Sequence, residues 1–175
     1  MEIIRIKNEK NTFFNAFWKI YESSFPLCER RSPDDQNRIF ANETYSLEIW
    51  TENETVTGFI GWWNCGDLRF IEHYAIHPDY RSRGYGSRLL SEWIKQSSLP
   101  VLLEIEPPAD ELSRKRQQFY YKLGFRDNDV KHSQPPYHKN EKPLKLWLMS
   151  YPREISANCY QKFYRKQLTE IMPQF

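Results

Sequence analysis

The chain of 175 residues contains the stretch Ala75-Ile-His-Pro-Asp-Tyr-Arg81-Ser-Arg83-Gly84-Tyr85-Gly86-Ser87-Arg88. Before it the apolar residues alternate with a period of two, and after it they recur with a helical period. The stretch is therefore predicted to join a strand (68–77) to an amphipathic helix (84 to about 97). Gly84 and Gly86 allow a tight turn, and the free N–H groups of a first helical turn attract anions. The alternative is a plain strand–turn–helix connection with solvated arginines.

This spacing differs from two well-known phosphate-binding patterns. It lacks the Gly-Lys-Ser/Thr of a P-loop, and it lacks the G-x-G-x-x-G of a dinucleotide-binding unit. The strands before it also form a hairpin meander, whereas a dinucleotide-binding unit opens with β-α-β. The sequence therefore predicts an anion site of another kind.

Hydrophobic periodicity predicts the remaining elements on both sides of this stretch. We expect further strands at 2–7, 45–51, 55–63, 100–106 and 144–149. We expect further helices from about 13 to 24, from 33 to about 41, and at 113–123 and 154–168, with an irregular loop at 127–143. Ser32 is predicted to cap the second helix, with Pro33 at its first position. An antiparallel meander feeding a β-α-β unit predicts an α/β (α+β) fold, a mixed sheet with helices on both faces.

Composition excludes several classes of protein. The net charge of +2 gives no bulk attraction to nucleic acid, and no apolar run is long enough to cross a membrane. The three cysteines are far apart and fit neither a disulfide scaffold nor a zinc module. We expect a cytoplasmic protein without a metal. The aromatic content is high, 16% of the residues, which indicates either an aromatic core or a lined pocket.

Two blocks of the sequence resemble the GNAT superfamily of N-acyltransferases. Arg81-Ser-Arg-Gly84-Tyr-Gly86 is similar to its acyl-CoA signature, in which Arg or Gln precedes two spaced small residues. Phe119-Tyr-Tyr-Lys-Leu-Gly-Phe125 is similar to its later FYxKLGF block. Because the blocks have the expected order with a strand between them, the chain is identified as a bacterial-type member over residues 1–151. The resemblance implies a mostly antiparallel, twisted sheet of six or seven strands and a V-shaped cleft between the fourth and fifth.

The resemblance also implies acetyl-CoA as cosubstrate. The pantetheine arm is expected along the backbone of Tyr74, Ala75 and Ile76. The pyrophosphate is expected at the turn and first helical residues of the motif, which are Arg81, Arg83, Gly84, Tyr85, Gly86 and Ser87.

Tyr120 is the expected proton donor to the leaving sulfur. It matches the tyrosine of the FYxKLGF block, which supplies the general acid in many GNAT enzymes. A phenol with a pKa near 10 is a plausible donor to a thiolate whose conjugate acid has a pKa near 8.5. The alternative role is core packing beside Phe119.

A base is needed because an alkyl amine with a pKa of about 10.4 is protonated at neutral pH. We expect Glu72 to serve, because strand alternation places it on the face of Tyr74 and opposite His73. Glu104 and His73 are the other candidates. The alternative for Glu72 is a carboxylate paired with an arginine on the sheet.

The acceptor site is expected from the first helices and the loop before the last strand. The candidate residues are Glu29, Arg30, Glu104, Gln134 and Tyr137. Carboxylates beside the cleft would suit a cationic amine of a small molecule or a peptide, whereas an ordinary surface loop is the plainer interpretation.

Two functions remain open at this point. The first is direct N-acetyl transfer to an amine, and the second is acyl-CoA binding without turnover, as in a sensor or an interaction domain. Residues 152–175 are expected to form a helical extension, packed on the same domain or at the interface of a homodimer.

Overall fold

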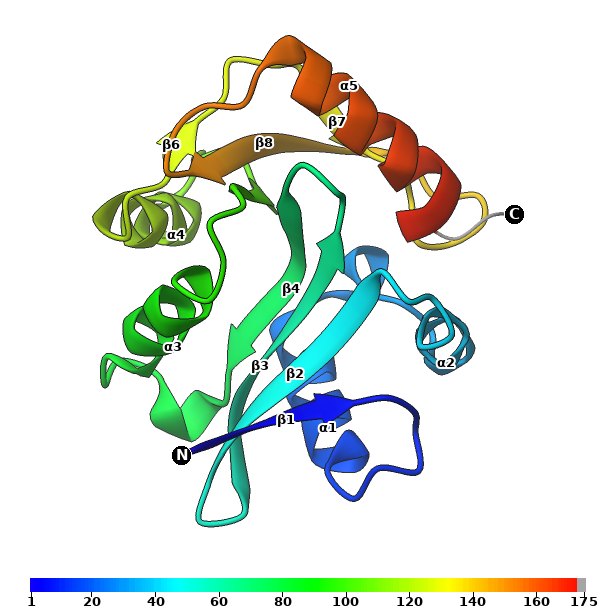
Figure 1. Ribbon diagram of the computed structural model, residues 1–175, viewed down its shortest axis with the longest axis vertical. Helices are drawn as coiled ribbons and strands as arrows, with labels where there is room; N and C mark the ends of the chain where they lie inside the picture. Colours follow the sequence, from blue (N-terminus) through cyan, green and yellow to red (C-terminus); the bar gives the residue numbers. More distant parts are fainter. Residues whose placement is uncertain (173–175) are drawn as a thin grey trace.

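The computed structural model describes residues 1–172, so the last three residues of the expected C-terminal extension lie outside the described part. Its strands run in the sheet order β1-β2-β3-β4-β5-β8-β6, with β7 paired to β8 (Figure 1). Their bounds are β1 Glu2–Ile6, β2 Tyr45–Glu52, β3 Thr55–Asn64, β4 Arg69–Ile76, β5 Val101–Ile105, β6 Arg126–Asp127, β7 His132–Gln134 and β8 Leu144–Tyr151. Among the strands of residues 1–172, only β4 and β5 pair in parallel, so the predicted mixed, mostly antiparallel sheet is confirmed.

In the described part of the chain the sheet has eight strands, where six or seven were expected. The additional strands are β6, of two residues, and β7, of three. Most of their residues lie in the stretch expected to be an irregular loop. Strands this short carry too few residues for a period-two pattern to be seen in the sequence.

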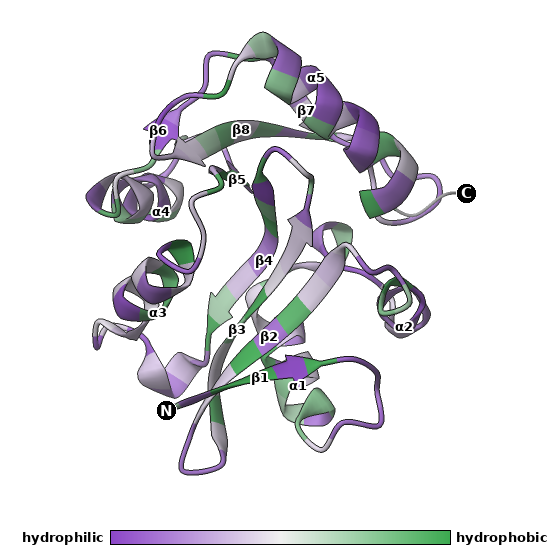
Figure 2. Cartoon of the chain, viewed as in Figure 1, coloured by the Kyte–Doolittle hydropathy of each residue, from purple (hydrophilic) through white to green (hydrophobic). Residues whose placement is uncertain are grey.

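Helices cover both faces of the sheet (Figure 1). The α-helices are α1 Phe14–Ser24, α2 Pro33–Ile39, α3 Tyr85–Ile94, α4 Glu111–Lys122 and α5 Ala157–Lys166, and the short helices are η1 Leu27–Glu29, η2 Pro78–Tyr80 and the π-helical η3 Gln167–Ile171. Buried residues of α1 and α5 join one hydrophobic cluster, and those of α3 and α4 join the other. Hydrophobic residues gather along the strands, while the connecting loops are largely hydrophilic (Figure 2).

Local capping explains where two of the helices begin. The Ser32 hydroxyl accepts from the Asp35 N–H at 3.1 Å, and Pro33 occupies the first turn of α2, as predicted. Helix α4 begins at Glu111, two residues before the expected start, because Asp110 and Ser113 form a reciprocal capping box.

β4 and β5 diverge soon after they meet. They pair only over Arg69–Ile71 and Val101–Leu103, and the following residues of both strands leave the ladder. The unpaired backbone at the carboxyl end of β4 therefore faces a gap in the sheet, which confirms the V-shaped opening between the fourth and fifth strands.

β4 also contains a bulge opposite β3. Gly61 pairs with His73 and Trp62 pairs with Ile71, so Glu72 is an extra residue on β4. A bulge of this kind breaks the alternation of side chains between the two faces.

The C-terminal segment packs on the same face as α1. Phe163 of α5 contacts Phe70 of β4 with ring centroids 4.8 Å apart, and Ile171 and Met172 are buried in that cluster. The segment after β8 therefore covers part of the sheet core and approaches the divergent strands.

Candidate active site

The opening between β4 and β5 is a cleft of about 710 Å³. Residues of α1, η1 and β7 line one side of it, and residues of α3 and α4 line the other. The cleft therefore connects the two faces of the sheet at the point where the strands separate. Two substrates entering from opposite faces would meet there.

The first turn of α3 provides an anion site at one end of the cleft. Gly84 has φ 77°, the left-handed conformation that glycine adopts without a steric penalty, and it precedes the helix as its N-cap. The Gly84 carbonyl accepts from the Arg88 N–H at 3.1 Å, so the amides of Tyr85, Gly86 and Ser87 precede the first intrahelical hydrogen bond. Together with the positive end of the helix dipole, these N–H groups suit a phosphate.

The helix end is fixed to β4 and α1 by side chains. The Tyr74 hydroxyl donates to the Gly86 carbonyl at 2.7 Å. Arg81 donates through Nε to the Ile76 carbonyl at 2.9 Å and through its terminal nitrogen to the Ser24 hydroxyl at 3.0 Å. The expected cofactor residue Arg81 thus lines the cleft, and its hydrogen bonds hold the turn against β4 and α1.

The remaining expected cofactor residues differ in what they offer. The Tyr85 side chain turns away and donates to Glu52 at 2.6 Å, so only its backbone faces the site. Arg83 is exposed on the turn, and Gly84, Gly86 and Ser87 line the cleft.

Backbone alternation identifies the N–H groups of β4 that face the cleft. The His77 N–H donates to the Thr57 carbonyl at 2.8 Å, so the Ala75 N–H also turns toward β3. The N–H groups of Tyr74 and Ile76 then point away from β3, to the side where β5 no longer pairs with β4. The Ile76 carbonyl, which accepts from Arg81, points the same way. Of the expected strand residues, Tyr74 and Ile76 therefore present unpaired N–H groups in the cleft.

Tyr120 lies in the wall of the cleft with 9% of its surface exposed. Its ring packs against Phe119 and Phe125 at centroid distances of 5.1 and 5.5 Å. Burial raises the pKa of its hydroxyl to about 12. The residue therefore stays protonated at neutral pH and can donate a hydrogen bond inside the cleft.

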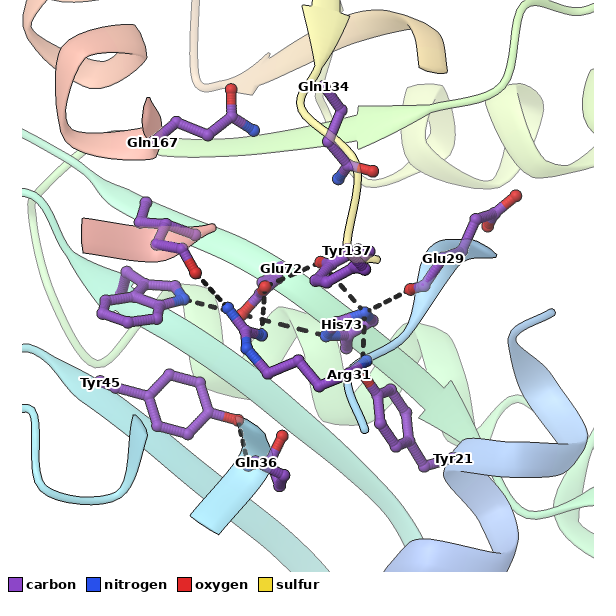
Figure 3. Close-up of polar contacts among 12 residues, drawn as sticks. Tyr21, Glu29, Arg31, Gln36, Tyr45, Glu72, His73, Gln134, Tyr137 and Gln167 are labelled. Atoms are coloured by element: carbon purple, nitrogen blue, oxygen red, sulfur yellow. Dashed lines mark hydrogen bonds and ion pairs between the residues drawn. The ribbon is translucent and has the colours of Figure 1, made fainter. Parts of the chain in front are cut away.

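Glu72 is part of a buried charged cluster on the α1 face (Figure 3). Its carboxylate forms an ion pair with Arg31, and neither side chain is exposed. It also accepts from the Trp63 indole N–H at 2.7 Å and the Tyr137 hydroxyl at 2.8 Å. Burial alone would favour the neutral acid, but the Arg31 charge outweighs it and lowers the pKa of Glu72.

The prediction that Glu72 shares a face with Tyr74 is wrong, because the bulge turns Glu72 and His73 to the same side of the sheet. The environment also argues against the expected role as base. Both carboxylate oxygens accept donors and the pKa is lowered, which suits a fixed charge better than a proton acceptor.

Tyr137 was expected to contact the acceptor, and the structure places it elsewhere. It is 1% exposed, donates to Glu72 and stacks under the Arg31 guanidinium at 5.3 Å from its ring centroid. Arg30, the other charged candidate of that group, does not line the cleft and pairs with Glu22 at 3.2 Å.

Glu104 and Gln134 do line the cleft, and they belong to a second polar cluster. Glu104 on β5 accepts from His132, from the Gln134 side chain at 2.6 Å and from the Gln167 side chain at 2.7 Å. Gln167 belongs to η3, and the Ile171 carbonyl at the end of the same turn accepts from Arg31. One π-helical turn thus contacts both clusters, a link that no sequence pattern indicates.

Glu29, the last residue of η1, is half-buried and lines the cleft on the α1 side. Its carbonyl accepts from His73 Nε2 at 2.9 Å, which holds η1 against β4. Burial and the nearby Glu106 charge raise the pKa of its carboxyl, although Arg116 opposes them.

Within residues 1–172, no group of three or more His, Cys, Asp or Glu side chains is placed to hold a metal ion. No helix in the described part of the chain is long and apolar enough to cross a membrane.

The fold and the cleft define an α/β domain with a divergent pair of parallel strands, and a family model matches part of it. Residues 43–127 match the model described as the acetyltransferase (GNAT) domain. This match confirms the resemblance to the GNAT acetyltransferase domain that the sequence predicts.

Solved structures share the fold. A protein from Bacteroides thetaiotaomicron assigned to the GNAT family superposes with a TM-score of 0.91 at 24% identity, covering 100% of both chains. The ribosomal-protein-S18-alanine N-acetyltransferase of Escherichia coli gives 0.62 at 18% identity, over 89% of this chain and 96% of its own. An aminoglycoside 6'-N-acetyltransferase complexed with coenzyme A gives 0.60 at 15% identity, over 86% of this chain and 96% of its own. No curated protein sequence matches the chain.

Proposed function

We propose that the protein transfers an acetyl group from acetyl-CoA directly to an amine, with both substrates bound in the cleft. The observation that carries this proposal is the position of Tyr120. Tyr120 lines the same cleft as the residues of β4 that leave the ladder and the first turn of α3. A binding module would need the anion site, but it would not need a protonated hydroxyl where the strands diverge.

The residues present fit acetyl-CoA. The amides of Tyr85, Gly86 and Ser87 would hold the pyrophosphate, and the Ile76 N–H would pair with the pantetheine arm. When bound, acetyl-CoA supplies the thioester carbonyl and the leaving sulfur. In this proposal the Tyr74 N–H donates to the thioester carbonyl oxygen, where negative charge develops.

Tyr120 donates to the sulfur in this account. With a pKa of about 12, the Tyr120 hydroxyl is a weaker acid than a thiol with a pKa near 8.5. Complete transfer of its proton to the thiolate is therefore unfavourable. The same burial that raises the pKa of Tyr120 also raises that of a thiol beside it, which narrows the difference. Tyr120 therefore acts mainly by a hydrogen bond that strengthens as charge grows on sulfur.

The acceptor enters from the face of α1, η1 and β7. The carboxylates of Glu29, Glu104 and Glu106 line this side, which favours a cationic acceptor over an anionic one. Two of the structural neighbours act on amines, namely a ribosomal-protein alanine and an aminoglycoside, which agrees with an amine acceptor here.

The test is a screen for acetyl-CoA-dependent thiol release. The purified protein is incubated with acetyl-CoA and with spermidine, kanamycin or an alanine-first peptide, and products are identified by mass spectrometry. Thiol release that requires the amine and yields its acetylated form supports the proposal. Tight acetyl-CoA binding with no product from any of the three would favour the sensor function instead.

A further inference from the structure

The carboxylates that line the cleft differ in whether their oxygens already have hydrogen-bond or ion-pair partners. Glu72 is paired with Arg31, and Glu104 accepts from three donors. Glu106 forms an ion pair with Arg116 at 2.6 Å. The side chain of Glu29 is the exception, because it makes no hydrogen bond or ion pair with any residue from 1 to 172.

We propose that the Glu29 carboxylate takes the proton from the acceptor ammonium, so that it is the general base of the reaction. This inference rests on the proposed function and assigns a catalytic role that the other carboxylates of the cleft do not fit. Glu72 does not fit because its ion pair with Arg31 lowers its pKa, and Glu106 already neutralises Arg116.

The position of Glu29 suits this role. The Glu29 carbonyl accepts a hydrogen bond from His73. The next residue along β4 is Tyr74, and the proposed function assigns the Tyr74 N–H to the thioester carbonyl. Figure 3 shows the Glu29 side chain leaving this anchor and pointing away from the Arg31–Glu72 cluster. The backbone is thus fixed to β4 while the carboxylate remains available to a ligand.

The electrostatic surroundings of Glu29 make its carboxylate a better proton acceptor. Burial and Glu106 raise its pKa, and Arg116 on α4 is the opposing charge. Lys115 also lines the cleft, but it pairs with Glu111 at 2.6 Å. His73 contacts the Glu29 carbonyl, and Cys28 precedes Glu29 in the chain. Burial lowers the pKa of His73, so that ring is neutral at physiological pH and does not offset the effect.

The protons balance in a simple sequence. The ammonium gives one proton to Glu29, and the freed nitrogen lone pair forms the C–N bond as the C–S bond breaks. The nitrogen then loses a second proton, which protonates the leaving thiolate while the Tyr120 hydroxyl stabilises its charge by a hydrogen bond. Glu29 releases the first proton to solvent, so each turnover yields the amide, the free thiol and one proton.

The test compares Glu29→Gln with the wild type across pH, using spermidine, kanamycin and the alanine-first peptide. Without the base, only the fraction of amine that is already neutral can react. We expect kcat/KM to fall by about 10²- to 10⁴-fold near pH 7 and the deficit to shrink steadily toward pH 10. Glu29→Asp should restore part of the activity at neutral pH.

Two controls separate chemistry from folding. Glu22→Gln makes the same change on an exposed side chain of α1 outside the cleft and should leave the pH profile unchanged. Hydroxylamine, a nucleophile that is neutral near pH 7 without help, should react at similar rates with the wild type and Glu29→Gln.

The outcomes are distinct. A deficit in Glu29→Gln that is the same at every pH, or no deficit, overturns the role of Glu29 while leaving acetyl transfer intact. A wild-type protein that binds acetyl-CoA and acetylates none of these amines overturns the proposed function, and the base with it.

Discussion

Arg31 and Glu72 form an ion pair that is completely closed to solvent. Arg31 lies between η1 and α2, and Glu72 is the bulged residue of β4. The pair therefore ties the α1 side of the cleft to the strand that diverges from β5. The Ile171 carbonyl, which also accepts from Arg31, extends this tie to the C-terminal segment.

Replacing Arg31 by Met should destabilise the fold severely, because it leaves the Glu72 charge buried without a partner. We expect the free energy of unfolding to fall by about 3–5 kcal/mol, measured by urea denaturation. The matched control is Arg38→Met, since Arg38 is 70% exposed in its pair with Asp35 and should lose no more than about 0.5 kcal/mol. Equal, small losses in both variants would contradict a structural role for the buried pair.

Acid should weaken the protein in two stages. Burial lowers the folded-state pKa of His73, so its contribution to stability is present above the unfolded value near 6.5 and is lost as the pH falls below it. Arg31 lowers the folded-state pKa of Glu72. Ionised Glu72 therefore contributes to stability above its unfolded-state pKa near 4.3, and this contribution is lost as the pH falls through its folded-state pKa. Urea midpoints between about pH 8 and pH 3 check both stages, and His73→Gln should remove the first. A midpoint that does not decrease over this range would contradict this assignment.

Gly84→Ala should weaken acetyl-CoA binding through the backbone. Gly84 has φ 77°, and an alanine in this conformation is strained by about 1–2 kcal/mol. Gly66→Ala is the matched control, because Gly66 has φ 78° and, like Gly84, has nothing within 4 Å of an added Cβ, but it lies outside the cleft. We expect similar losses of stability in both variants and weaker acetyl-CoA binding by calorimetry only in Gly84→Ala. Equal binding in the two variants would argue against the α3 turn as the pyrophosphate site.

Most of the fold could be predicted from the sequence because its signals are local. The change of hydrophobic period at residues 75–88, the Ser32 cap and the glycine after α4 each specify one element boundary. Gly124, with φ 93°, ends α4 where a left-handed residue is required. Strands β6 and β7 were missed because two or three residues carry no period.

The site could be predicted only in part, because its polar clusters are built from distant segments. The first turn of α3 and Tyr120 follow from contiguous motifs. The partners of Glu72 are Arg31, Trp63 and Tyr137, up to 65 residues away in sequence. The bulge that turns Glu72 to the α1 face depends on the register with β3, which alternation along one strand cannot reveal.

The most direct test of acetyl transfer is the turnover number of Tyr120→Phe beside that of Tyr121→Phe. The Tyr121 hydroxyl bonds to Asp127 and Gln117 outside the cleft, so its loss is a matched change without a catalytic consequence. We predict that both variants bind acetyl-CoA as the wild type does, that Tyr121→Phe keeps its kcat, and that kcat of Tyr120→Phe falls by about 10²-fold or more. Equal kcat values for Tyr120→Phe and the wild type would contradict the account.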